Sequence, residues 1–186
     1  REVYGMWLTQ QLALVQHTTR LLCLAASKEP VSAKQNHREW LKHLREETNH
    51  DIMLVQDLKK LGFEESTFPV LWSAEVIIHN QYYWLEHSHP VSLYGYSLML
   101  EGLASRLVPQ FIDRLQKAHS KESISFLKHH ADFDQDHFRD GLELLNALPE
   151  NLKGLVSANL RQSTALYTKL MEDVATSFRT QDDKAA

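Results

Sequence analysis

Residues 43–50, HLREETNH, and residues 130–137, HADFDQDH, share one arrangement of histidine and acid. Both follow the pattern His-x3-acid-x2-His, whose members are His43, Glu47 and His50 in the first stretch and His130, Asp134 and His137 in the second. On an α-helix these offsets place the three side chains of each stretch within a stripe roughly 60° wide. Because imidazole and carboxylate are usual ligands of first-row metals, two such stripes facing each other predict a metal site.

The surroundings of both stripes favour an inward-facing site. The first stripe continues along its helix to Leu54, and the second shares its face with Phe126, Leu127 and Gly141. A buried carboxylate without a partner would cost several kcal/mol, and a divalent metal would supply the partner charge. The alternative is that the stripes are surface charge next to ordinary core histidines.

Glu101 is a further candidate ligand. It stands in the run YGYSLMLEGLASRL, where most of its neighbours are apolar. An acid in such a run is costly unless it is paired, so we expect it to bridge a metal pair. The alternative is a salt bridge to Arg106 or Arg38.

Helical periodicity extends along the whole chain. Apolar residues recur at helical spacing and no long stretch alternates with period two, which predicts an all-α fold with one core. Ser32 and Pro69 are expected at helix starts and Gly62 at a helix end; Gly95, Gly102 and Pro109 predict a bend. The predicted helices cover residues 3–26, 32–61, 69–87, 92–118, 122–148 and 149–177; one domain is expected over 1–178, with a flexible tail over 179–186.

Composition limits the function classes. The chain has 186 residues and a net charge of −4, which gives no general attraction to nucleic acid or to an anionic membrane. Its single cysteine, Cys23, excludes an internal disulfide framework and a Cys-rich metal site. The N-terminal residues do not resemble a targeting segment and no apolar run reaches the ~20 residues needed to span a bilayer. We therefore expect a cytoplasmic protein.

Three strings resemble the haem-oxygenase-like iron oxidases, which are related to thiaminase-II (TENA) and pyrroloquinoline-quinone synthase C proteins. The strings are HLREETNHDIMLVQDLKKLG, HPVSLYGYSLMLEGLA and HHADFDQDHF, which lie within residues 41–138, a span of over half of the chain. The resemblance implies a haem-oxygenase-like bundle of about seven helices, two non-haem irons that activate O₂, and an organic substrate in an adjoining pocket. One position departs from the family pattern, because His43 stands where members commonly carry Glu, seven residues before the first ligand histidine; we expect Glu47 to serve instead.

On this resemblance we assign ligands to two irons, although another divalent metal fits the same residues. One iron takes Glu47, His50 and His137, the other takes His43, His130 and Asp134, and Glu101 bridges them. Three carboxylates leave one positive charge of two ferrous ions unbalanced, which favours a carboxylate-bearing substrate. Aromatic residues of the third and fourth predicted helices are pocket candidates, with core packing as the alternative: Tyr82, Tyr83, Trp84, Tyr94 and Tyr96. Glu101 and Tyr96 are the candidate catalytic residues.

Other readings of the same residues stay open. A ferritin-like di-iron protein would use Glu47, His50, Glu101, Asp134 and His137, but it needs an acid where His17 stands. A helical binding module that has lost its metal is the non-enzymatic alternative. Haem oxygenase activity is disfavoured by the missing Gly-rich signature, and thiaminase activity by the position of Cys23. The expected partners are a small-molecule substrate and O₂, and a homodimer is one expectation because such bundles often pair.

Overall fold

Helices make up nearly all of the described chain. The structure, a computed structural model, describes the backbone of residues 1–182 and the side chains of residues 1–132 and 136–178. Within residues 1–182 the elements are α1 (Glu2–Lys28), α2 (Lys34–Glu46), α3 (His50–Lys60), α4 (Trp72–His87), the 3-10 turn η1 (Pro90–Ser92), α5 (Leu93–Arg106), α6 (Val108–His119), α7 (Ser125–Ala147) and α8 (Glu150–Asp182). That range contains no strand, so the all-α prediction is confirmed.

The helix predicted over residues 32–61 is two helices, α2 and α3, because the backbone turns at Asn49. Asn49 has φ 75°, in the left-handed region that asparagine tolerates better than most residues. Gly62, with φ 79°, follows the end of α3 as expected. The expected cap at Ser32 is wrong: Ala33 is the N-cap residue, and its N–H closes a turn to the Pro30 carbonyl at 2.8 Å.

The helix predicted over residues 92–118 is also divided, at the bend that its sequence predicted. Only Leu107 separates α5 from α6, and Pro109 lies in the first turn of α6, where a missing N–H costs no hydrogen bond. Pro69, in contrast, precedes α4 instead of entering its first turn. Its carbonyl accepts a hydrogen bond from Gln10 Nε2 at 3.0 Å, while Leu71 N–H donates to Gln10 Oε1 at 2.8 Å, so this connection is tied to α1.

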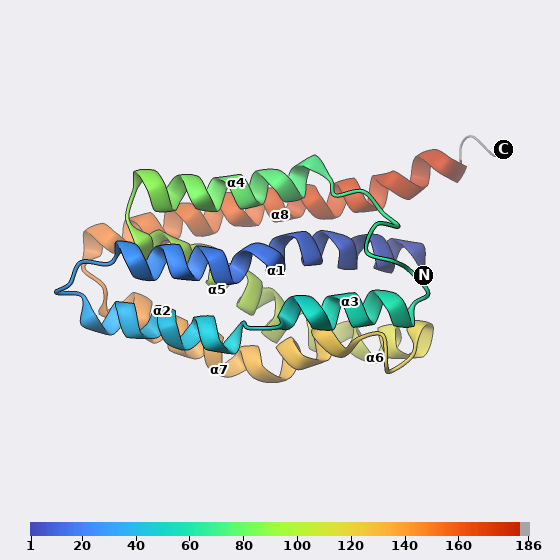
Figure 1. Ribbon diagram of the computed structural model, residues 1–186, viewed down its shortest axis with the longest axis horizontal. Helices are drawn as coiled ribbons and strands as arrows, with labels where there is room; N and C mark the ends of the chain where they lie inside the picture. Colours follow the sequence, from blue (N-terminus) through green and yellow to red (C-terminus); the bar gives the residue numbers. More distant parts are fainter. Residues whose placement is uncertain (183–186) are drawn as a thin grey trace.

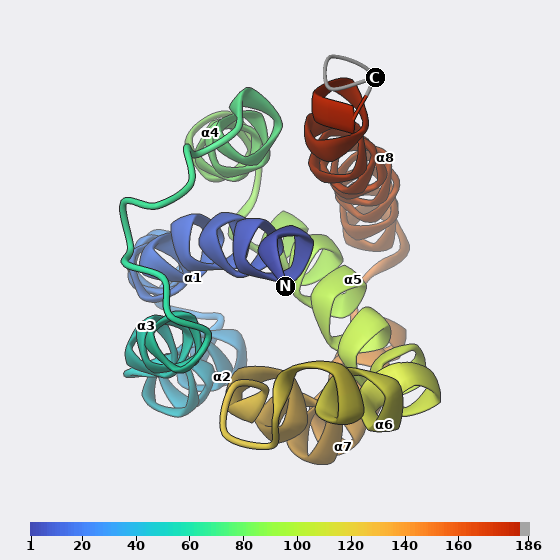
Figure 2. The same ribbon diagram turned by 90° about the vertical axis from the view of Figure 1, so that its right-hand side faces the viewer.

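The helices form three layers. Helices α4 and α8 make one outer layer, α1 and α5 the middle layer, and α2, α3, α6 and α7 the other outer layer (Figures 1 and 2). Helix α1 packs against α2, α3 and α4, and α5 packs against α7 and α8. The middle layer therefore contacts both outer layers and separates α4 from α2, α3 and α7.

The apolar core has two parts, where the sequence suggested one. One cluster joins α4, α5 and α8 to one side of α1, and the other joins α3, α6 and the beginning of α7 to another side of α1. Trp7 and Phe68 pack against both clusters. The division matters because the main cavity of the protein lies between the two clusters.

Helix α8 is held close to α5 and α4. A Cβ atom on Gly95 would lie 2.4 Å from the Val156 carbonyl oxygen, so this glycine permits the close approach of α5 and α8. The buried side chains of Gln81, Asn159 and Ser163 hydrogen bond to one another at 2.8–3.2 Å and join α4 to α8. Helix α8 continues to Asp182, beyond its expected end at residue 177; residues 183–186 of the expected tail lie outside the described residues. No helix in the described part of the chain has the length and apolarity required to cross a membrane.

Candidate metal centre

Six of the seven predicted ligands come together where α2, α3, α5 and α7 meet. Their nitrogen and oxygen donors form two groups, and within each group the donor atoms lie within 4.8 Å of one another. The His43 group contains His43, Glu101 and His137, and the His50 group contains Glu47, His50 and His130. The seventh, Asp134, lies on α7 between two of these ligands, and its side chain is outside the described residues.

The grouping differs from the sequence-based assignment, because His130 and His137 exchange places. Helix α7 runs antiparallel to α2 and α3, so the sequence positions rise along one side of the contact and fall along the other. His43 therefore faces His137, with ring centroids 5.8 Å apart, and His50 faces His130, with centroids 4.7 Å apart. The two stripes do face each other, but the order of their members is reversed.

Glu47 links the two groups. Its Oε2 lies 2.9 Å from His50 Nδ1, and its Oε1 lies 3.5 Å from His43 Nε2. His43 Nε2 is also 3.5 Å from Glu101 Oε1. The break at Asn49 makes this possible, since Glu47 follows the end of α2 while His50 begins α3.

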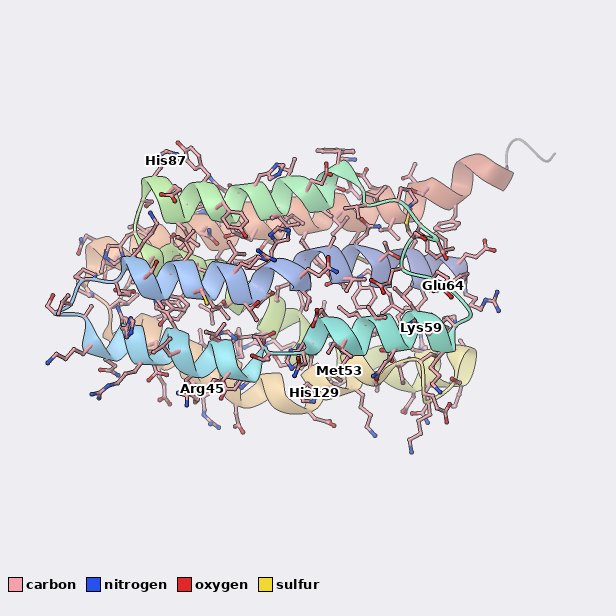
Figure 3. The ribbon with its side chains drawn as sticks, in the orientation of Figure 1. Arg45, Met53, Lys59, Glu64, His87 and His129 are labelled. Atoms are coloured by element: carbon pink, nitrogen blue, oxygen red, sulfur yellow. The ribbon has the colours of Figure 1, made fainter. Side chains whose placement is uncertain are left out.

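Glu101 is buried, at 8% exposure, and contacts the ligand cluster. Neither arginine alternative is seen among the described ion pairs: the Arg106 guanidinium instead lies 4.7 Å from the centroid of the Phe138 ring. His129, which was not expected on the stripe, lies where α3 and α7 meet (Figure 3). Its ring centroid is 5.0 Å from that of His50, so it belongs to the edge of the centre.

Opposite charges stabilise the ionised forms of these groups. Burial alone would lower the pKa of His43, but its hydrogen bond to Glu47 and the charge of Glu101 outweigh burial and raise the pKa to about 9. Burial alone would raise the pKa of Glu47, but hydrogen bonds from His43 and His50 hold it below its usual range. The centre thus concentrates negative charge that recruits positive charge, from protons or from a metal.

The residues fit a divalent metal. Each group offers three donors from imidazole and carboxylate, the set that suits iron, manganese or zinc. His130 Nδ1 lies 2.9 Å from the Phe126 carbonyl oxygen, which fixes the ring and leaves Nε2 for coordination. Such support by a backbone carbonyl is usual for metal-bound histidine.

Asp57 positions the centre from a distance, and the sequence reasoning missed it. Its side chain is fully buried and accepts three hydrogen bonds at the start of α7, from Ser125 N (3.1 Å), Ser125 Oγ (2.6 Å) and Phe126 N (2.9 Å). These bonds fix the register of α7 against α3 just before His130. The sequence could have pointed to Asp57, because this acid lies between Leu54 and Leu58 on the buried face of α3, where a carboxylate needs a partner.

A cavity of about 640 Å³ adjoins the centre. Its polar end is formed by His43, Glu47, Glu101 and His130, and the remaining wall is mostly aliphatic and aromatic, from α1, α5, α6, α8 and the beginning of α7. Tyr96 lines it from α5 at 5% exposure, and burial together with the nearby Tyr167 and Glu47 raises its pKa. A second cavity of about 50 Å³ reaches the His43 group from the other side, beside Glu46 and Asp140.

The other aromatic candidates do not line the main cavity. Tyr82, Tyr83 and Trp84 lie on α4, which the middle layer separates from the centre. Tyr94 stacks on Trp40, with centroids 3.9 Å apart. The expectation that the third predicted helix forms the pocket is therefore wrong, because helical periodicity does not show which neighbour a face contacts.

Comparisons with known proteins agree with this architecture. A domain of unknown function with a heme oxygenase-like fold from Shewanella denitrificans OS217 superposes with a TM-score of 0.87 at 19% identity, covering 97% of this chain and 80% of that one. A TenA homolog from Pseudomonas syringae pv. tomato DC3000 gives a TM-score of 0.76 at 14% identity, covering 94% and 79%. At these identities the likeness shows the fold alone. No curated protein matches the chain.

The family is shown by a match along most of the sequence. The family model described as "Iron-containing redox enzyme" matches residues 6–167, a range that contains every residue of both ligand groups. The predicted resemblance is thereby confirmed at the level of family and fold. The chain belongs to the family of iron-containing redox enzymes and has a heme oxygenase-like fold.

Proposed function

We propose that the protein is a non-haem iron oxidoreductase that uses O₂ to oxidise a small organic substrate held in the main cavity. The observation that carries the proposal is the position of the two three-donor groups, because two residues of each group form the polar end of a mostly apolar cavity. A substrate in the cavity would lie directly beside both groups. The family match supports iron as the metal.

The chain would hold the metals and exclude water. The His43 group would bind one iron and the His50 group the other, with Asp134 as a further ligand expected from its spacing. Bound iron would supply the electron transfer to O₂ that amino-acid side chains lack. Glu47 and Glu101 both line the cavity, so a substrate there would lie beside their carboxylates, and the apolar walls would keep competing water away. Tyr96 keeps its proton near Glu47 and is available to donate it.

The substrate we propose bears a carboxylate. Glu47, Glu101 and Asp134 supply three negative charges against the four positive charges of two ferrous ions. An anionic group on the substrate would balance the remaining charge inside a low-dielectric site. This charge balance favours a carboxylate at the polar end of the cavity over a neutral substrate.

Iron content tests the proposal. After anaerobic loading with Fe(II) and desalting, the wild type is expected to retain two irons per chain. His130→Ala is expected to lose the iron of the His50 group, and His137→Ala the iron of the His43 group. His87→Ala is the control, because His87 is exposed on α4, away from the centre (Figure 3). Full iron retention by both ligand variants, or none in the wild type, would end the proposal.

The alternative of a binding module without metal also has an observation in its favour. The pairs of His43 and His50 with Glu47 satisfy much of the buried charge without an ion. A folded wild type that takes up no iron, and whose O₂ consumption does not depend on iron, would support this alternative. The ferritin-like reading loses its basis, because the fold is heme oxygenase-like and His17 lies 3.0 Å from the Tyr82 hydroxyl on α4, away from the ligand groups.

A further inference from the structure

Tyr167, on α8, has a hydroxyl oxygen that already accepts a hydrogen bond from α1. Trp7 Nε1 donates to it at 3.3 Å. The neighbouring Gln11 Nε2 is buried and has no hydrogen-bond partner among the described residues. Because an indole N–H can only donate, the Tyr167 proton must point away from Trp7.

Tyr167 belongs to the lining of the main cavity, together with Trp7 and Gln11. Among the described residues, no oxygen accepts a hydrogen bond from the Tyr167 hydroxyl. Burial raises the pKa of Tyr167 to about 12, although the neighbouring Trp7 and Gln11 side chains lower it in part, so the proton is retained at neutral pH.

The wall around this donor lacks a counterion for an anion. Arg1 is the only lysine or arginine among the described residues that line the cavity, and its guanidinium lies 5.0 Å from the centroid of the Phe63 ring. Of the three cavity histidines, His43 and His130 belong to the metal centre, and burial lowers the pKa of His119, which disfavours its charged form. A carboxylate at Tyr167 would therefore be buried with neutral donors alone, which is costly, whereas an uncharged oxygen needs only one hydrogen bond.

We propose that Tyr167 is the hydrogen-bond donor of a binding site for an uncharged oxygen of the ligand. The cavity then takes a molecule with an apolar body and a carbonyl, ether or hydroxyl oxygen placed away from the end that meets the metals. This deepens the proposed function, on which it rests for the statement that the ligand is the substrate. The binding site itself is defined by side chains outside both ligand groups.

A pair of neutral probes tests this site. The probes are 5-nonanone and 5-methylidenenonane, in which a CH₂ group replaces the carbonyl oxygen. Their binding to the full chain, freed of metal by chelation, is followed by tryptophan fluorescence. Tyr167→Phe is expected to weaken ketone binding about three- to tenfold, the value of one neutral hydrogen bond, and to change alkene binding by less than about twofold. Tyr82→Phe, the matched control, should alter neither, because Tyr82 is not a cavity residue and bonds with His17.

Equal weakening of both probes by Tyr167→Phe, or no weakening of either, would overturn the proposal. A second measurement does not depend on the variant. In the infrared spectrum, the carbonyl stretch of ¹³C-labelled 5-nonanone bound to the wild type should lie below its position in hexane, because the bond accepts a hydrogen bond. A hexane-like frequency would overturn the proposal even if Tyr167→Phe does not fold. Neither probe needs a metal, so a failure of iron binding would leave this test intact.

Discussion

Replacing Asp57 with asparagine should loosen the contact between α3 and α7 and weaken one half of the metal centre. The change is nearly isosteric, but the amide keeps a single oxygen acceptor. In the native protein both carboxylate oxygens are used, one by the N–H and hydroxyl of Ser125 and the other by the N–H of Phe126. At least one buried N–H at the start of α7 must then face an NH₂ group.

The magnitude follows from these bonds. A buried N–H left without an acceptor costs about 1–3 kcal/mol, and loss of a helix N-terminal acceptor typically costs about 1 kcal/mol. We therefore expect Asp57→Asn to lower the free energy of unfolding by about 2–3 kcal/mol, or the Tm by about 5–10 °C for a chain of this length. The Phe126 carbonyl also accepts the hydrogen bond from His130 Nδ1 that orients the imidazole ring. A shift of Phe126 in Asp57→Asn would therefore misplace this ligand, and the iron affinity of the His50 group should fall about tenfold or more.

Two measurements check this, with Asp113→Asn on the exposed face of α6 as control. Urea unfolding of the metal-free protein gives the change in stability. Anaerobic Fe(II) titration gives the two affinities, and only that of the His50 group should change strongly, because His137 lies farther from the start of α7. If Asp57→Asn matches Asp113→Asn in both measurements, Asp57 does not set the register of α7.

Three further predictions concern charge and backbone. In the metal-free protein, Glu47→Gln should lower the free energy of unfolding most between about pH 4.5 and 6.5. The pKa of Glu47 is lowered in the folded protein, so the stability contributed by its carboxylate is lost as pH falls below 4.5. The pKa of His43 is raised to about 9, so the stability contributed by its charged ring is lost as pH rises from 6.5 towards 9. Urea unfolding across pH measures this, and a difference independent of pH would contradict it. Gly95→Ala should destabilise the protein by about 3 kcal/mol, because the new Cβ would lie 2.4 Å from a backbone oxygen of α8. Gly154→Ala should stabilise it by about 0.5–1 kcal/mol, because a Cβ there meets nothing within 4 Å. Thermal unfolding would refute the reasoning if the two variants behaved alike. Asn49→Ala should lower the free energy of unfolding by about 1 kcal/mol, because alanine is strained at the positive φ of this position, whereas Asn49→Gly should not. An equal loss for both variants in urea unfolding would show that backbone strain at residue 49 does not cause the loss.

Local patterns predicted much of the fold. Apolar periodicity located all the helical stretches, Pro109 marked the bend between α5 and α6, and Gly62 marked the end of α3. The patterns failed where a distant partner decides the outcome. Asn49 breaks a stretch whose composition is helical throughout, and Gln10 holds Pro69 out of α4 through hydrogen bonds that span about sixty residues of sequence.

The sequence by itself determined which side chains share a face, and so which histidines and acids are candidates for metal ligands. For His130 and His137 this follows from helical geometry, which is local, because both lie on α7. The first stripe instead crosses the turn at Asn49, between α2 and α3. The tertiary structure alone decided that His43 meets His137 and that His50 meets His130, because the antiparallel register of α7 is set by Asp57 and by packing between distant segments. It also decided where the cavity lies, since its lining residues come from α1, α2, α5, α6, α7 and α8, and no local pattern specifies which of these helices are neighbours.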